Sequence, residues 1–196
     1  MSNPVEEFFG SSESSDVPMY LKLTEGKNKV RVLSDKLVLG WEGWYQGKPV
    51  RVSPNEPLSE EEQALLDKRK RDDGTEYPSY QQFGACLVYN YAVGAVQIWE
   101  FTQASIKSAF TQYISDPEWG DLREFDLTIE RTGKGLQTRY AVSPSPKKPQ
   151  TDEVKKAFAA TRLDPKTLLT DKGNLERLAK IKEAAGAQIS PDDIPF

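Results

Sequence analysis

Two β-rich runs that meet at one glycine constrain the fold of this chain more than any other feature. They read LVYNYAV and AVQIWEF within residues 83–101, and Gly94 lies between them. Valine, isoleucine and aromatic residues favour strands, and a glycine between two such runs is typical of the turn of an antiparallel hairpin. Because successive side chains of a strand point to opposite faces, the pattern places Ile98 on one face and Trp99 on the other.

Both strands of this hairpin carry aromatic side chains beside polar neighbours, so neither face is purely apolar. A sheet that exposes rings to solvent suits the stacking of unpaired bases, which requires ring faces and no sequence code. The alternative is that the rings form the core and the polar residues face water. The sequence leaves both interpretations open for the group of rings.

The 196-residue chain contains one cysteine, Cys86, and no histidine. This composition excludes a disulfide framework and zinc sites built from His and Cys, and it removes His-based acid–base catalysis. One cysteine inside a strand is typical of a reducing compartment, so we expect the cytoplasm. No run of 18 apolar residues is present, and the acidic N-terminus is unlike a signal peptide, so we expect no membrane segment. We predict a non-enzymatic protein with no metal and no cofactor.

Charge is distributed unevenly along the chain, although the net charge is only -4. Residues 1–17 hold four acids and no base, and residues 189–196 hold two acids and no base. Residues 20–51 instead carry seven bases against three acids. A basic stretch beside aromatic residues indicates an anionic partner.

The order of the expected elements predicts a mainly β fold with one or two helices. The ranges are strands over 20–53, an inserted helical arm over 58–73, the hairpin in 83–101, a helix over 102–114, and strands over 124–131 and 136–142. Ser59 and Glu62 match a capping box at the start of the arm. This order is typical of an OB-fold-like small antiparallel barrel with an extra hairpin, which we expect over residues 18–145.

The segments that flank the expected barrel have a different composition. Residues 1–17 are acidic and low in complexity, so we expect disorder. Residues 146–188 begin with a Pro/Ser-rich stretch and continue with charge and alanine, which predicts a linker with short helices. We therefore expect a flexible, partly helical C-terminal tail that ends in an acidic tip over 189–196.

Aromatic and basic residues interleave through the expected barrel. Base stacking and phosphate neutralisation are the two components of single-stranded nucleic-acid binding. The candidate residues are Lys27, Lys29, Arg31, Lys36, Trp41, Trp44, Tyr45, Lys48, Arg51, Tyr80, Tyr89, Tyr91, Trp99 and Arg139. We expect Trp44 and Trp99 to be the leading stacking residues. The sequence contains no GxxxxGK phosphate loop, which disfavours ATP-driven remodelling.

The C-terminal residues resemble the acidic tip of bacterial single-stranded-DNA-binding proteins (SSBs), and they are Asp192, Asp193, Ile194, Pro195 and Phe196. The body is similar to phage-encoded SSBs through EGKNKVR at 25–31, FDLTIER at 125–131 and YAVSP at 140–144. The resemblance implies an OB-fold that binds and protects single-stranded DNA without sequence specificity in replication, recombination and repair. It also implies a tip that recruits a polymerase, helicase, primase or nuclease in the host-cell cytoplasm. The chain departs from one phage type because it lacks zinc ligands and a basic N-terminal arm.

The tip has a chemical rationale of its own. Ile194 and Phe196 are apolar anchors, Pro195 stiffens them, and the neighbouring carboxylates require a basic pocket on a partner. Two other functions stay open. One is a protein–protein adaptor or virion component with buried aromatics. The other is a metal-dependent nuclease that uses Asp116, Glu118, Asp121, Glu124 and Asp126. The sequence indicates no oligomeric state.

Overall fold

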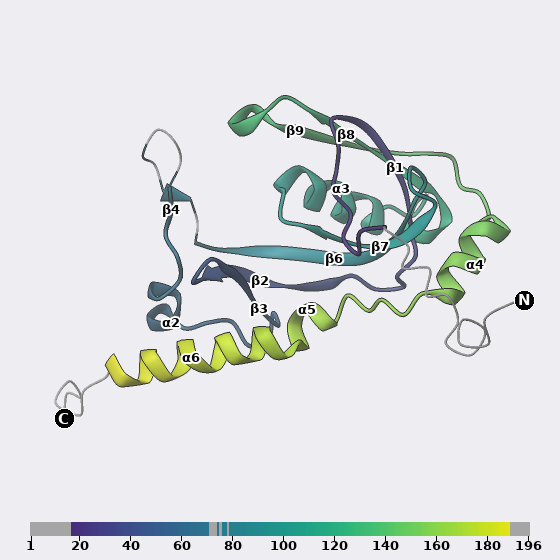
Figure 1. The fold of residues 1–196 in the computed structure, drawn as a ribbon. Helices are drawn as coiled ribbons and strands as arrows, with labels where there is room; N and C mark the ends of the chain where they lie inside the picture. Colours follow the sequence, from purple (N-terminus) through teal and green to yellow (C-terminus); the bar gives the residue numbers. More distant parts are fainter. Residues whose placement is uncertain (1–16, 71–73, 75, 78, 189–196) are drawn as a thin grey trace, which may run out of the picture.

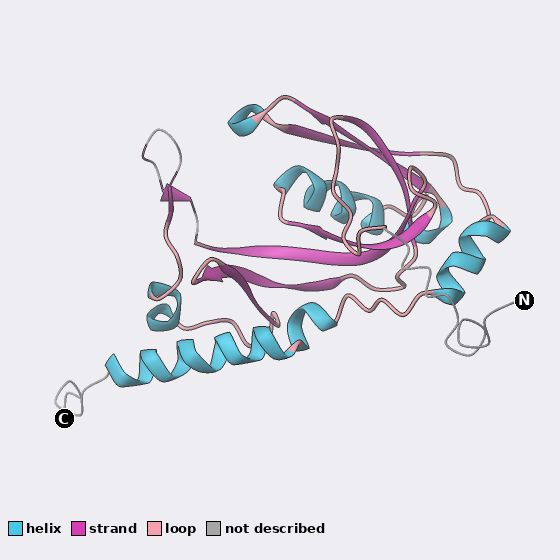
Figure 2. Ribbon diagram, in the orientation of Figure 1, coloured by secondary structure: helices cyan, strands magenta, loops and turns pink. Residues whose placement is uncertain are grey.

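One seven-stranded antiparallel sheet organises the protein (Figures 1 and 2). The computed structural model describes residues 17–70, 74, 76–77 and 79–188. The strand order is β3-β2-β6-β1-β8-β9, and β7 pairs with β6 off this path. The strands are β1 Gly26–Val32, β2 Val38–Tyr45, β3 Lys48–Val52, β6 Tyr80–Asn90, β7 Ala95–Phe101, β8 Asp126–Thr132 and β9 Arg139–Pro144. The predicted mainly β class is confirmed.

The remaining elements are helices and two short strands outside this sheet. They are α2 Glu60–Ala64, β4 Arg69–Lys70, β5 Glu76–Tyr77, α3 Ala104–Ser115, α4 Asp152–Ala160, α5 Thr167–Thr170 and α6 Lys172–Gln188, with 3-10 turns η1 Leu122–Glu124 and η2 Gly135–Gln137. The predicted capping box of Ser59 and Glu62 is present at α2. The helix is shorter than the predicted 58–73. It ends at Ala64, and the Asp67 N–H donates to the Trp44 carbonyl of β2 at 2.7 Å and not to a carbonyl of the helix. No helix of the described residues is long and apolar enough to cross a membrane.

The order of the elements along the chain is as predicted, including the extra hairpin. Strand β1 lies between β6 and β8, α3 connects the β6–β7 hairpin to the β8–β9 hairpin, and β2–β3 is inserted after β1. Strands β7 and β9 do not pair within the described part of the chain, so the sheet is not closed. The finer assignment to an OB-fold therefore stays a prediction.

The main core lies between the inner face of the sheet and α3. Trp99 is 1% exposed and meets Phe110 edge-to-face, with ring centroids 5.4 Å apart. Phe101 lies 4.9 Å from Phe110, and a Cβ added at Gly84 would lie 2.5 Å from the Phe101 ring. The interpretation of Trp99 as a leading stacking residue is wrong, because a buried ring in this core cannot reach a base.

A buried polar neighbour explains the error at Trp99. Gln97 lies on the same face of β7 and is 3% exposed. Its side-chain oxygen accepts from Asn90 Nδ2 at 2.8 Å, and its amide donates to the Pro18 carbonyl at 2.6 Å. Because a buried amide is tolerated when it is hydrogen-bonded, a polar residue in a strand does not mark the solvent face.

The outer face of the sheet carries a second core, which the C-terminal segment covers. We call residues 145–171 the strap. Val154 and Leu168 of the strap are buried against Leu87 and Ile98, and Figure 1 shows α4 and α5 on the side of the sheet away from α3. The helices expected in residues 146–188 are present, but they pack on the sheet and do not form a free linker.

Helix α6 continues from the strap along the free edge of β3. The Asn174 side chain accepts from the Arg51 N–H and donates to the Arg51 carbonyl, both at 2.8 Å. Arg177 Nε donates to the Pro49 carbonyl at 2.9 Å. Ile181 is fully buried in the core beside β3. These contacts provide hydrogen-bond partners for backbone groups of the edge strand β3, which would otherwise be unpaired.

We predict that Trp99→Ala lowers the free energy of unfolding by about 3–5 kcal/mol, because it leaves a cavity in the main core. Trp41→Ala is the matched control, since Trp41 is half-buried and should cost less. Urea denaturation followed by circular dichroism measures both. Unchanged stability of Trp99→Ala would contradict the core position of this ring.

Candidate nucleic-acid interface

One buried carboxylate gathers three cations on the outer face of the sheet. Asp126, the first residue of β8, is 1% exposed. Its Oδ1 accepts from Arg31 Nε at 2.6 Å and from the Tyr91 hydroxyl at 2.9 Å. Its Oδ2 lies 2.7 Å from Lys148 Nζ and 3.2 Å from Lys29 Nζ. The cluster therefore carries more positive than negative charge.

Four segments of the chain position this cluster. Pairing of β1 with β8 places Arg31 opposite Asp126, and Lys29 lies two residues earlier on the same face. Tyr91 directly follows β6, where its N–H donates to the Lys29 carbonyl at 3.2 Å. Lys148 comes from the strap. Lys148 of the strap thus completes a site that the residues of β1 and β8 and Tyr91 begin.

The electrostatics separate a buried part of the cluster from an exposed part. Arg31 is 1% exposed, and its Nη1 also donates to the Arg123 and Lys148 carbonyls at 3.0 Å. The side chains of Lys29 and Lys148 are 48% and 45% exposed. Since Asp126 neutralises one charge, positive charge remains at the two half-exposed lysines.

The titration of the cluster follows from these contacts. Burial alone would raise the pKa of Asp126, but hydrogen bonds from Lys148, Arg31, Tyr91 and Lys29 outweigh it and hold this pKa at about 2. Burial, together with the hydrogen bond to Asp126, raises the pKa of the Tyr91 hydroxyl to about 12. The carboxylate is therefore charged and the phenol neutral at neutral pH.

An aromatic ring lies inside this basic surface. Tyr91 is half-buried, and Lys29 Nζ lies 4.8 Å from the centre of its ring. The ring also meets Tyr89 edge-to-face at 5.1 Å. We call Lys29, Tyr91 and Lys148 the basic patch. Of its three members, only Lys148 was missed by sequence reasoning.

Several predicted binding residues are engaged elsewhere. Tyr89 is 1% exposed and donates its hydroxyl to Glu153 of the strap at 2.7 Å. Arg51 Nε and Nη2 reach Glu42 and Glu100 at 2.9 and 2.6 Å, so its charge is already neutralised. Arg31 and Tyr89 are buried and support the fold, so assigning them direct contacts with DNA is wrong. A contact of the half-buried Arg51 with DNA stays a prediction.

A second group of predicted residues gathers on the β2–β3 hairpin, away from the basic patch. Trp41 stacks on Tyr80 with centroids 5.3 Å apart and an interplanar angle of 18°. The Tyr80 hydroxyl accepts from the Leu58 N–H at 2.9 Å. Trp44 and Tyr45 are half-buried on the same hairpin. These rings support the segment around α2. The remaining predicted residues are exposed cations, namely Lys27, Lys36, Lys48 and Arg139.

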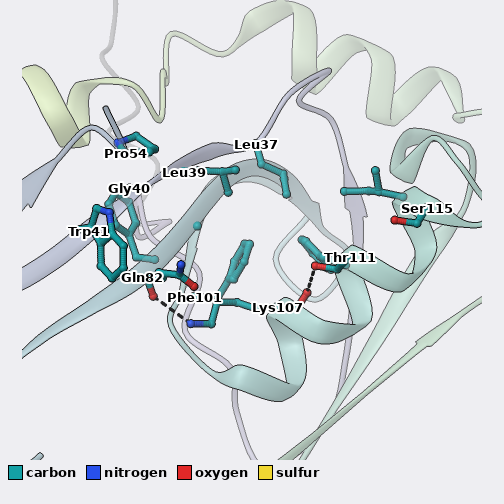
Figure 3. A pocket seen from close by; sticks show the side chains of 14 residues that line it. Leu37, Leu39, Gly40, Trp41, Pro54, Gln82, Phe101, Lys107, Thr111 and Ser115 are labelled. Atoms are coloured by element: carbon teal, nitrogen blue, oxygen red, sulfur yellow. Dashed lines mark hydrogen bonds between the residues drawn. The ribbon is translucent and has the colours of Figure 1, made fainter. Parts of the chain in front are cut away.

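An apolar pocket of about 530 Å³ lies between β2, β6 and α3 (Figure 3). Its apolar lining includes Leu37, Leu39, Phe101, Phe110 and Ile114. Its one charged side chain, Lys107, donates to the Gln82 carbonyl at 3.3 Å. The sequence did not predict this pocket, because its walls come from three elements that are far apart along the chain.

The five acids of the nuclease alternative do not form one site. Four of them have separate partners: Asp116 accepts from the Glu118 N–H, Asp121 pairs with Arg123, Glu124 pairs with Lys147, and Asp126 pairs with the three cations of the cluster. In the part of the chain that the structure describes, no group of three or more His, Cys, Asp and Glu residues could hold a metal ion.

The predicted partner-binding tip, Asp192 to Phe196, lies outside the described residues. Comparison with known proteins adds no relative, since no family model and no curated protein matches the chain. The candidate interface therefore depends on the geometry of the basic patch and on the sequence pattern.

We predict that Asp126→Asn lowers the free energy of unfolding at neutral pH by about 3–5 kcal/mol, because it leaves the buried Arg31 charge uncompensated. The pKa of Asp126 is about 2 in the folded state against an ordinary 3.8, so its contribution to stability is present above about pH 4. That contribution is lost as the pH falls through about 2. The free energy of unfolding of the variant should not show this decrease. Urea denaturation over this pH range measures both effects.

Asp121→Asn is the control for this prediction. Asp121 also pairs with an arginine, Arg123, but their side chains are 40% and 43% exposed. An exposed pair contributes only about 0–1 kcal/mol. Equal destabilisation by the two substitutions would contradict the role given to the buried Asp126 cluster.

Proposed function

We propose that this protein binds single-stranded DNA without sequence specificity and without catalysis, and protects it during replication, recombination and repair. The observation that supports the proposal is the convergence of three cations on one buried carboxylate. Because of it, Lys29 and Lys148 present uncompensated positive charge beside the Tyr91 ring. Lysines neutralise backbone phosphates, and rings stack with unpaired bases.

The order of the elements supports the same proposal. An OB-fold is the finer fold that we propose for residues 18–145, with β1, β6–β7, α3 and β8–β9 as its parts and β2–β3 as an insertion. Such folds bind oligonucleotides on a strand face and its loops. Duplex DNA should bind more weakly, because its stacked bases offer no free faces.

Recruitment of other proteins is the second part of the proposed function. The acidic and apolar tip over 189–196 suits a basic pocket with an apolar floor on a polymerase, helicase, primase or nuclease. We place this activity in the cytoplasm of a bacterial host. This part rests on the chemistry of the tip and on the sequence resemblance.

The apolar pocket favours a second candidate function, that of a protein–protein adaptor. Leu39 and Ile114 line it and are 54% and 48% exposed, and such apolar exposure suits a peptide side chain. A band shift with labelled oligo(dT) in EDTA, followed by addition of Mg²⁺, separates the candidates. A binding protein shifts the oligonucleotide intact, a nuclease cleaves it, and an adaptor leaves it unshifted.

We predict that the affinity for oligo(dT) falls linearly with log[salt], with a slope of about -0.7 for each phosphate neutralised. The double variant Lys29→Gln/Lys148→Gln should bind more weakly, and its slope should be flatter by roughly 1.4 because two phosphate contacts are lost. Fluorescence anisotropy with a labelled oligo(dT) measures both values across a salt series.

The matched control is Lys155→Gln/Lys172→Gln, which removes the same charge from α4 and α6. Lys155 lies 3.6 Å from Asp152 and Lys172 lies 3.7 Å from Glu176, both on the surface. This control should keep the wild-type slope to within about 0.3. Equal losses in both double variants would show that overall charge, and not the basic patch, governs binding.

We predict that deletion of residues 191–196 leaves the affinity for single-stranded DNA unchanged or raises it, most at low salt. The tethered acidic tip competes with DNA for a cationic surface, and salt screens that competition. The same deletion should abolish capture of partner proteins in pull-downs from the native cell lysate. Loss of DNA binding, or retention of every partner, would contradict the role of the tip.

A further inference from the structure

The strap determines which part of the sheet an oligonucleotide can reach. In an OB-fold, the second and third strands supply the face that binds oligonucleotides, and here these strands correspond to β6 and β7. The outer face of β6 and β7 is covered by α4 and α5, since Val154 is fully buried and Leu168 is 3% exposed against it. This half of the sheet is therefore closed to a ligand.

Displacement of the strap by DNA would be costly. It would expose the apolar side chains of Leu33, Phe83, Leu87 and Ile98, which form one core with the strap. It would also break the hydrogen bond from the Tyr89 hydroxyl to Glu153. Burial of apolar surface is the main stabilising contribution to folding, so the strap stays docked when a ligand binds.

The other half of the outer face is not covered by any of the described residues. Cross-strand register places Lys29, Thr128 and Ser143 in one row across β1, β8 and β9. A second row contains Lys27, Glu130 and Ala141. All six side chains are exposed or half-buried, and among the residues that the structure describes Figure 1 shows no helix over this side of β8 and β9. We call these two rows the track.

The track is adjacent to the basic patch and shares Lys29 with it. Lys27 and Lys29 on β1 and Arg139 at the start of β9 are exposed cations, and Lys148 adds a fourth from the strap. Glu130 is the exposed acid of the rows, while Asp126 is buried and already neutralised. Small side chains at Thr128, Ala141 and Ser143 leave room between these charges, as a polyanion with bulky bases requires.

We propose that single-stranded DNA crosses the sheet along the track on β1, β8 and β9, with the strap as a fixed wall that contributes Lys148. This path rests on the proposed function and specifies it. Lys29 from the floor and Lys148 from the wall bind backbone phosphate, and the bases lie over the small residues of β8 and β9. Because Lys148 then contacts both Asp126 and DNA, binding also stabilises the docked strap.

Site-specific photo-crosslinking tests the path. Cys86 is fully buried, and burial raises the pKa of its thiol, so a maleimide reagent should label only an introduced cysteine in the folded protein. Thr128→Cys and Ser143→Cys carry a benzophenone maleimide onto the track. Ala159→Cys on α4 and Gln112→Cys on α3 are exposed controls on other surfaces. Circular dichroism checks that each labelled variant is folded.

We expect crosslinks to labelled oligo(dT) from residues 128 and 143, at least tenfold above those from 159 and 112, and loss of all crosslinks with excess unlabelled oligo(dT). Crosslinks from 159 or 112, with none from the track, would overturn the path while leaving DNA binding intact. Failure of the unlabelled protein to shift oligo(dT) would overturn the proposed function and the path together.

Hydrogen exchange tests the fixed position of the strap in the unmodified protein. Amides of residues 152–170 should exchange at the same rate or more slowly when oligo(dT) is bound, because Lys148 holds the strap at the site. Faster exchange of these amides in the complex would show that DNA displaces the strap, and it would overturn the path along the track.

Discussion

The ion cluster of Asp126 is the interaction on which the rest of the candidate interface depends. One carboxylate joins β1, the end of β6, β8 and the strap through Arg31, Tyr91 and two lysines. A buried charge is stable only when it is paired and hydrogen-bonded, so these four segments must meet for any of them to be placed correctly. The structural requirement to neutralise Arg31 thereby fixes Lys29 and Lys148 where an anion can reach them.

Hydrogen bonds from distant segments also cover the edges of the sheet. Helix α6 satisfies the free edge of β3, and residues before β1 satisfy that of β7, where Leu21 donates to the Ile98 carbonyl and Ile98 donates to the Met19 carbonyl, both at 2.9 Å. With α3 on the inner face and the strap on half of the outer face, little of the sheet remains accessible. Besides the apolar pocket between β2, β6 and α3, the outer face of β1, β8 and β9 remains accessible among the described residues, and it carries the basic patch.

Much of the fold could be predicted because it is local. Gly94 forms the turn of the predicted β6–β7 hairpin with a φ of +65°. Long-range pairing could not be predicted: Arg31 looks exposed in sequence, yet it is buried by a carboxylate 95 residues away. Lys148 was missed because it lies in a Pro/Ser-rich stretch without periodicity. The packing of the strap on the sheet could not be predicted, because its apolar residues are few and Val154 lies between charged neighbours.

The most direct test of the account is a titration of uniformly ¹⁵N-labelled protein with oligo(dT), followed by amide chemical shifts. We predict that the largest changes in chemical shift occur at residues 27–31, 126–130, 139–143 and 147–149. The amide chemical shifts of α3 and of the apolar pocket around Leu39 should not change. Shifts concentrated at Leu39, Lys107 and Ile114, with none around Asp126, would contradict it.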